Sequence, residues 1–249
     1  MVSDLQFISK IDEELTKAVK SSCNSEVGLL FSGGIDSSIL AFLILKKTNC
    51  KIRLYTVGTE NSYDIRNARD RNIFKLKAKE IIINENDVMN GMNDLLKMIG
   101  RMSAFEIAIS LPIYFVCKVA KEKKIIYGQG ADELFFGYRK YIFLSEKELK
   151  KRYAIDIKKC KNFYERDKKI ASAFRKEIYA PFLDPEVIKV CENIPVDYKI
   201  KNGMRKYILR IFALSLNVPK EVVWQEKKAM QYGTGLMKIV NQLLIRRFY

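Results

Sequence analysis

One short run limits what this chain can fold into more than any other: the apolar stretch at residues 27–30 passes directly into FSGGIDSS at residues 31–38. Two glycines let the backbone turn tightly and approach an anion, and a helix that starts after them presents free N–H groups. A turn before a capped helix would explain a bare Ser-Gly-Gly. The full Ser-Gly-Gly-x-Asp-Ser pattern after an apolar strand instead favours a phosphate-binding loop, formed by Ser32, Gly33, Gly34, Asp36 and Ser37.

The first half of the chain alternates short apolar runs with helical patterns. Strands are predicted at residues 27–31, 52–57, 80–83 and 125–127, and helices at residues 35–47, 64–77, 88–99 and 112–121, the last opened by Pro112 with Ser110 as its cap. Strands separated by helices predict an α/β fold with a doubly wound parallel sheet. Ligands of such sheets bind at the carboxyl ends of the strands.

Strand signals fade after Tyr141, and the segment SEKELKKRYAIDIKKCKNFYERDKK has the charge pattern of an exposed helix. No low-complexity linker or internal repeat divides the chain. We therefore predict one domain, with a nucleotide-binding sheet core at residues 1–140 and a mainly helical, substrate-side part at residues 141–249. An amphipathic pattern at the start of the chain predicts a helix with one apolar side, made of Leu5, Ile8, Ile11 and Leu15.

A second glycine-rich run, YGQGADELFFGY at residues 127–138, follows the strand predicted at residues 125–127. A carboxylate beside a phosphate repels it unless a cation lies between them. Asp132 of this run and Asp36 of the first both follow strands, so we expect them to converge. Two carboxylates together with phosphate oxygens and water suit Mg²⁺, and a magnesium site at Asp36 and Asp132 is predicted.

The composition narrows the chemistry further. The chain has no His, which excludes His-ligated metals and Ser-His-Asp triads. Its five Cys form no CxxC pair and follow no secretion signal, which favours reduced thiols and a cytoplasmic location. No stretch reaches the roughly 18 apolar residues of a membrane span, so no membrane partner is expected. The net charge of +16 fits RNA binding, attraction of ATP, or a compositional bias towards Lys.

The first glycine-rich run resembles the signature of the PP-loop ATP pyrophosphatases, and the chain contains no Walker A loop. The second run is similar to the GEGSDELFGGY run of asparagine synthetases, in their synthetase domain. Similar segments follow in the order of that family: TVG and SYD at residues 56–64, APFLD at 180–184, RKYILR at 205–210 and WQEKKAMQYGTG at 224–235. The resemblance spans residues 27–235 and implies a fold like that of the adenine nucleotide alpha-hydrolases.

The resemblance implies an amide ligase that uses ATP and Mg²⁺. ATP would be cleaved between its α- and β-phosphates to adenylate a small-molecule carboxylate, aspartate being the default, and ammonia or an amine would displace AMP. Leu30 and Val57 would flank the adenine, Gly128 would lie at the nucleotide, and the loop at residues 32–37 would hold pyrophosphate. Lys227 would reach the α-phosphate or the developing oxyanion, where positive charge lowers the barrier.

Departures from the family pattern concern the amine step. The family has a Glu at the position of Gln129, and a carboxamide cannot act as a base. An acid there, next to Tyr138, could accept or relay the proton of the incoming nitrogen, so Gln129 and Tyr138 are the residues on which this step depends. Phe136 replaces a Gly. The start of the chain does not match the family's glutaminase domain, so nitrogen is expected from ammonia, an amine or a separate glutaminase subunit.

Two other functions stay open. A PP-loop enzyme that adenylates an RNA base, with tRNA as its partner, would use the net charge of +16, although the lack of a CxxC pair argues against a thiolating enzyme. A nucleotide-binding subunit without catalytic activity would fit Gln129, but the presence of Asp36, Asp132 and Lys227 argues against it. The amide ligase is the favoured function.

Overall fold

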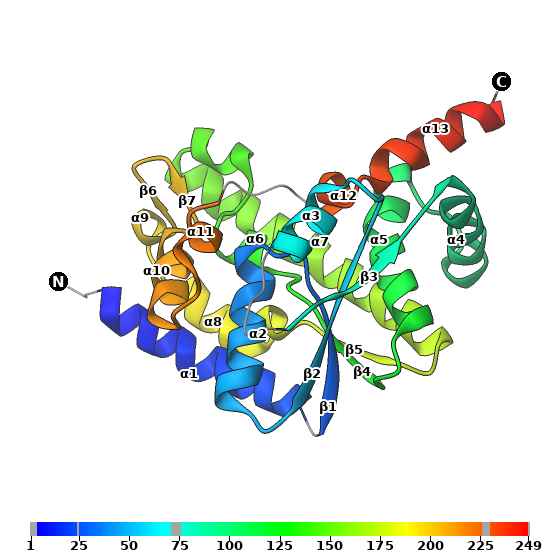
Figure 1. The fold of residues 1–249 in the computed structure, drawn as a ribbon. Helices are drawn as coiled ribbons and strands as arrows, with labels where there is room; N and C mark the ends of the chain where they lie inside the picture. The colour runs from blue at the N-terminus through cyan, green and yellow to red at the C-terminus, as the bar shows by residue number, and fades with distance from the viewer. Residues whose placement is uncertain (1–3, 24, 71–75, 226–229, 249) are drawn as a thin grey trace.

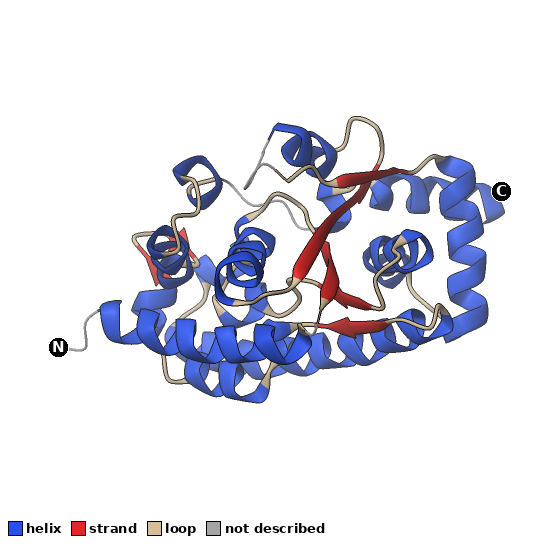
Figure 2. Ribbon diagram, turned by 60° about the horizontal axis from the view of Figure 1, so that its bottom comes forward, coloured by secondary structure: helices blue, strands red, loops and turns tan. Residues whose placement is uncertain are grey.

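The fold is a parallel sheet between two layers of helices (Figures 1 and 2). The computed structural model describes residues 4–23, 25–70, 76–225 and 230–248. All strand pairs in the sheet are parallel, and its order is β3-β2-β1-β4-β5. The strands are β1 (Glu26–Leu30), β2 (Lys51–Gly58), β3 (Lys79–Ile82), β4 (Lys124–Ile126) and β5 (Glu177–Tyr179). The predicted doubly wound parallel sheet is confirmed.

Helices follow or separate the strands along the whole chain. They are α1 (Asp4–Ser22), α2 (Ile35–Lys47), α3 (Tyr63–Asp70), α4 (Glu85–Ile99), α5 (Ala104–Val119), α6 (Ala131–Leu134), α7 (Glu146–Ala173), α8 (Pro185–Glu192), α9 (Val196–Lys199), α10 (Tyr207–Ser215), α11 (Lys220–Val223), α12 (Met230–Gly233) and α13 (Leu236–Phe248). A small antiparallel hairpin, β6 (Ile200–Lys201) with β7 (Met204–Arg205), precedes α10. The part of the chain after Tyr141 is mainly helical, as predicted, but it also contains β5 and this hairpin. These strands are too short to show an alternating pattern in the sequence.

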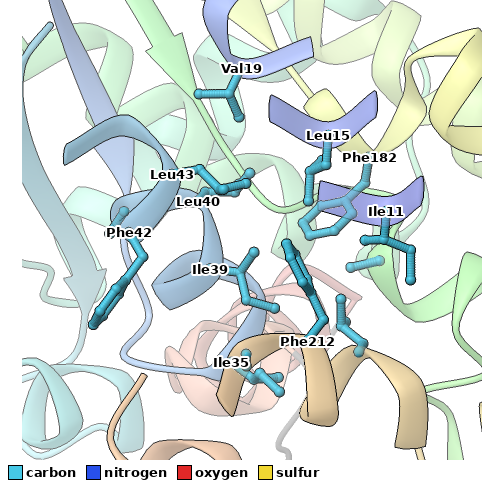
Figure 3. Close-up of a cluster of buried hydrophobic side chains, with 14 of the residues drawn as sticks. Ile11, Leu15, Val19, Ile35, Ile39, Leu40, Phe42, Leu43, Phe182 and Phe212 are labelled. Atoms are coloured by element: carbon cyan, nitrogen blue, oxygen red, sulfur yellow. The ribbon is translucent and has the colours of Figure 1, made fainter. Parts of the chain in front are cut away.

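Each face of the sheet carries its own apolar core. On one face, α1, α2, α8 and α10 pack together, and Figure 3 shows side chains of α1 and α2 meeting Phe182 and Phe212. On the other face, α4, α7 and α13 pack against α5, and α5 contacts β2, whose Tyr55 and Val57 belong to the same apolar cluster. Because helices cover both faces of the sheet, the central strands appear in the sequence as continuous apolar runs and not as alternating patterns.

Three sequence predictions differ from the structure. Pro112 does not open a helix: it lies inside α5, which begins after the N-cap Ser103, whose side chain accepts a hydrogen bond from the Glu106 N–H in a capping box. The buried side of α1 is formed by Phe7, Ile11, Leu15, Ala18 and Val19, whereas Leu5 is 75% exposed. The helix predicted to reach residue 77 is α3, which ends at Asp70, and residues 71–75 lie outside the described residues.

Among the described residues, no single helix is long and apolar enough to cross a membrane. The consecutive helices α4 and α5 reach the required length and composition only together, and the chain bends by 100° between them. Most of α5 is buried in the core of this domain.

Candidate functional site

The strand order places a ligand crevice at β1 and β4. The chain moves outward from β1 through β2 to β3, then returns to β4 on the other side of β1. Crevices outside the carboxyl ends of such neighbouring strands are where doubly wound sheets bind ligands. The run after β1 and the run after β4 both line one cavity here, together with residues from α3, α10 and the β7–α10 junction. Its volume is ≈ 140 Å³.

The loop after β1 is folded around its own serine hydroxyls. The Ser37 hydroxyl donates to the Gly34 carbonyl (3.1 Å), while the Gly34 N–H donates to the Ser32 hydroxyl (3.3 Å). Gly33 has φ +70°, and a Cβ there would lie 2.9 Å from the Cβ of Asn67. Only glycine fits such a position without strain. The loop ends at Gly34, the N-cap of α2, and no side chain caps that helix. Its first N–H groups and positive dipole end therefore suit an anion.

The side walls of the cavity come from β1, β2 and the loop after β4. Leu30 and Val57, the residues predicted to flank the adenine, line it, and that role stays a prediction. The Thr56 hydroxyl donates to the Phe31 carbonyl (2.6 Å) and ties the ends of the two strands together. Gly128 also lines the cavity, and a Cβ there would lie 3.2 Å from the Cβ of Asp36. The absence of a side chain at Gly128 lets the two glycine-rich runs approach each other.

A buried ammonium group joins the two acids predicted to bind a metal. The Nζ of Lys206 lies 2.6 and 2.7 Å from the two carboxylate oxygens of Asp36 and 2.8 Å from Oδ1 of Asp132. Lys206 is 2% exposed, while the side chains of both acids are 14% exposed. Asp36 and Asp132 are separated by 96 positions in the sequence. In the structure they are close enough to share one cation. In this structure that cation is a lysine side chain.

The same two carboxylates fit the chemistry of Mg²⁺. This ion is commonly held by one or two carboxylates plus phosphate oxygens and water. Within the described part of the chain, no group of three or more acidic, Cys or His side chains could form a complete protein cage for a metal. The donor set therefore fits an ion that would arrive with a nucleotide, and Lys206 would have to share or leave its position for that ion to bind.

Two arginines extend the positive charge along the cavity. Arg205 donates from Nη1 to the Gly137 carbonyl (2.7 Å), and Arg210 donates from Nε to the Arg205 carbonyl (2.9 Å). Both line the cavity, and burial lowers the pKa of the Arg210 guanidinium from its ordinary value. Lys206 and these arginines were missed as site residues. Their signal in the sequence is the RKYILR segment, used above only as evidence of resemblance.

Gln129 and Tyr138, expected at the amine step, have different surroundings. Gln129 lines the cavity, but its amide Nε2 donates to the Sγ of Cys160 at 3.2 Å. The Tyr138 hydroxyl donates to Glu133 at 2.7 Å, and Tyr138 is not among the described residues that line the cavity. Burial and the nearby Asp132 and Glu133 raise the pKa of Tyr138 far above its ordinary value. Tyr138 can therefore donate a hydrogen bond but does not ionise.

Lys227, the predicted contact of the α-phosphate, lies outside the described residues. Two described residues of the same segment, Gln225 and Met230, line the cavity. The Gln225 amide contacts Tyr63 and donates to the Asn67 side chain at 3.2 Å, which ties this segment to α3. The role of Lys227 stays a prediction.

Comparison with known proteins places these features in one family. The family model of asparagine synthase matches residues 10–179 and 143–246. A provisionally named glutamine-hydrolyzing asparagine synthetase of Methanocaldococcus jannaschii is 34% identical, over 93% of this chain and 51% of the relative. The glutamine-hydrolyzing asparagine synthetase of Gallus gallus is 30% identical, over 85% of this chain and 40% of the relative. The chain thus spans about half or less of the length of these relatives.

Among solved structures, the U34-tRNA thiolase NcsA from Methanococcus maripaludis is similar with a TM-score of 0.39 and 14% identity, over 94% of this chain and 80% of that one. The sequence matches are much stronger. The residues matched by the family model include the loop after β1, the acidic run after β4 and the basic segment that carries Lys206. By its sequence, and with the cavity that its two glycine-rich runs build, this chain belongs to the asparagine synthase family.

Proposed function

We propose that this chain is an ATP-dependent ligase that adenylates a small carboxylate and releases pyrophosphate, after which ammonia or an amine displaces AMP. The observation that carries the proposal is the cavity in which the loop at residues 32–37 meets Asp36, Asp132 and Lys206. Membership of the asparagine synthase family supports this reaction class, and aspartate is the first substrate to test.

In this proposal, the hydrogen-bond donors, the acids and the basic residues of the cavity have different roles. The N-terminus of α2 and the Ser32 and Ser37 hydroxyls offer donors to the pyrophosphate part of ATP. Asp36 and Asp132 would hold Mg²⁺, which neutralises charge between phosphate oxygens when bound. Lys206 and Arg210 add positive charge fixed in a site that is largely closed to water, where such charge stabilises a transition state most effectively. Lys227 would do the same at the α-phosphate.

The nitrogen donor is the second part of the proposal. The relatives named above are glutamine-hydrolyzing. We propose that ammonia attacks the acyl-adenylate, supplied either free in solution or by a glutaminase. Gln129 stands at the family's Glu position with its amide turned to Cys160, so no carboxylate base is supplied from that position.

The experiment measures the products formed from ATP and Mg²⁺ with aspartate and other small carboxylates, with and without ammonium. We expect AMP and pyrophosphate in equal amounts, dependent on the carboxylate. Asp36→Asn and Asp132→Asn should each lower turnover by orders of magnitude, and the double variant should lose little more, since residues that act as one unit are not additive. ADP and inorganic phosphate as main products would refute the proposal.

One observation favours a second substrate class. The net charge of +16 fits a polyanionic partner, and an RNA base carbonyl could accept AMP as a carboxylate does. The same assay with bulk tRNA in place of carboxylates separates the two. Pyrophosphate release that depends on tRNA and not on any carboxylate would establish the RNA-modifying function.

A further inference from the structure

A second cavity lies beside the first and shares no lining residue with it among the described residues. It has a volume of ≈ 530 Å³ and is built by the start of α7, the end of α8, α9 and the turn after α6. The two cavities are nearest in sequence at that turn, where Phe136 lines the second and Gly137 the first. Its volume lies within the range of roughly 300–1,000 Å³ that small-molecule sites commonly have.

A buried lysine lines this second cavity without an acceptor. Lys199 is 3% exposed, and within the described chain its ammonium makes neither a hydrogen bond nor an ion pair. Its Nζ lies 4.9 Å from the ring centre of Phe136 and 5.1 Å from that of Tyr153. Burial lowers the pKa of Lys199 to about 8, which shows how poorly the described residues solvate its charge. Cys191 and Glu192 act on this charge only through space, so the buried ammonium between two aromatic faces is suited to an added anion.

A second buried donor in the same place lacks an acceptor as well. Tyr153 lines the cavity, and its hydroxyl is inaccessible to solvent and has no hydrogen-bond partner in the described structure. Buried hydroxyl groups are normally paired, because an unpaired one costs about 1–3 kcal/mol. One carboxylate has enough acceptor positions for both the ammonium and the hydroxyl.

The mouth of the cavity has the opposite charge. Glu192 and Asp197 are exposed and line it, while Glu146 at the same mouth pairs with Lys150 at 2.8 Å. A simple anion would be repelled there, whereas a ligand with its own ammonium group would be attracted. Ile194 and Val196 add an apolar wall between the basic interior and the acidic mouth.

We propose that this second cavity binds an α-amino acid with an apolar side chain. The carboxylate faces Lys199 and Tyr153, the ammonium faces Glu192 at the mouth, and the side chain packs against Phe136 and the apolar wall. The site is separate from the one that would adenylate a carboxylate, and it does not depend on the function proposed for that site.

The test is equilibrium dialysis of the full chain with L-leucine, L-phenylalanine and L-aspartate. Two matched analogues of leucine accompany them: 4-methylpentanoate, which lacks the ammonium, and 3-methylbutylamine, which lacks the carboxylate. We expect saturable binding of leucine or phenylalanine, weaker binding of 4-methylpentanoate and no binding of 3-methylbutylamine. Lys199→Met should weaken amino-acid binding about ten- to a hundredfold, as expected for loss of a hydrogen bond to a charged group.

Two further variants keep the outcome clear. Glu192→Gln changes an exposed side chain, and it should weaken leucine binding a few-fold and 4-methylpentanoate binding less, because only leucine loses the partner of its ammonium. Asp36→Asn, in the other cavity, should leave leucine binding unchanged. The proposal is overturned if neither apolar amino acid binds saturably, if Lys199→Met binds as well as the wild type, or if Asp36→Asn abolishes the binding while its circular dichroism spectrum shows that it is folded.

Discussion

Lys206 places a buried positive charge between two acids of the cavity formed by the two glycine-rich runs. Its ammonium lies between the carboxylates of Asp36 and Asp132, all three largely buried. We expect Lys206→Met to lower the free energy of unfolding by about 3–5 kcal/mol, because it removes the buried ammonium that lies between these two carboxylates. Excess MgCl₂ should then raise the melting temperature of this variant more than that of the wild type. Thermal unfolding with and without MgCl₂ measures both effects.

The control variant combines Lys206→Met with the removal of one of the two negative charges. Adding Asp132→Asn to Lys206→Met should recover part of the lost stability, since only one carboxylate then remains. Equal melting temperatures for the wild type and Lys206→Met would show that the three charged groups are not coupled. For the same reason, Asp36→Asn is expected to cost stability as well as activity, because it removes a partner of the buried ammonium.

A substitution of Gln129 is expected to affect the second step of the proposed reaction, amine attack, more than the first step, adenylation. Adenylation needs positive charge, whereas amine attack also needs a proton acceptor, which is typically worth about a hundredfold to ten-thousandfold in rate. We expect Gln129→Glu to raise the ratio of amide to pyrophosphate, with little change in ATP affinity. Both products are measured with aspartate and ammonium.

Cys160→Ala is the matched control, because it releases the Gln129 amide from its contact without adding an acid. An equal rise in the product ratio in this control would assign the effect to side-chain freedom and not to a base. If the wild type already forms amide and pyrophosphate in equal amounts, and Gln129→Glu lowers both, then Gln129 itself contacts the substrate.

At the scale of elements, local sequence signals predicted some boundaries well and others not at all. The α2 helix has both predicted ends, since Gly34 precedes it and two lysines lie in its last turn. The error at α5 arose because Pro112 suits a first turn, while α5 is buried on nearly all sides and shows no amphipathic pattern. Its true start is signalled by Ser103 and Glu106, a capping box visible in the sequence.

Some features depend on contacts between residues far apart in the sequence, and the local sequence pattern alone does not predict them. The three residues of β5 become a strand by pairing with β4, and three residues cannot show an alternating pattern. The two glycine-rich loops were predicted to meet, since sheet topology alone brings them together. Lys206 could not be singled out, because its partner Asp36 lies 170 residues away and the chain has 45 Lys and Arg residues.

The start of α5 gives a prediction at this scale. Ser103→Ala should lower the free energy of unfolding by about 1 kcal/mol, because it removes the side-chain acceptor for the Glu106 N–H. Ser21→Ala is the control, since the Ser21 hydroxyl only donates back to the Ala18 carbonyl within α1. Urea unfolding of both variants is the measurement. Equal losses of stability in the two would show that the cap has no specific role.

At the scale of the whole molecule, the buried Lys199 makes stability depend on pH. Its pKa falls from 10.5 to about 8, with burial as the main cause and Cys191 and Glu192 acting in the opposite direction. Between these values the unfolded chain holds a proton that the folded chain has released, so this lysine's contribution to stability rises with pH. Lys199→Met should therefore be more stable than the wild type at pH 7, and the difference should shrink by about 3 kcal/mol by pH 10.5.

The comparison of the wild type with Lys199→Met measures the contribution of the Lys199 ammonium alone. Buried thiols and phenols away from Lys199, such as Cys117 and Tyr55 with pKa values raised to about 12, make both proteins less stable above pH 9. Those losses are common to the wild type and the variant and cancel in the difference. Parallel curves of unfolding free energy against pH would contradict the assignment.

The position of Lys206 in the chain also sets the order in which the site can be completed on the ribosome. The phosphate loop and Asp36 are made first, and their buried counter-charge follows 170 residues later. At translation rates of roughly 5–20 residues per second, that interval lasts roughly 10–30 s. During this time the last strand of the sheet, β5, is added, yet the acids still lack their lysine. The nascent sheet can thus form well before the cavity around Asp36 and Asp132 does, and a newly made chain acquires the electrostatics of the site only after Lys206 has been made.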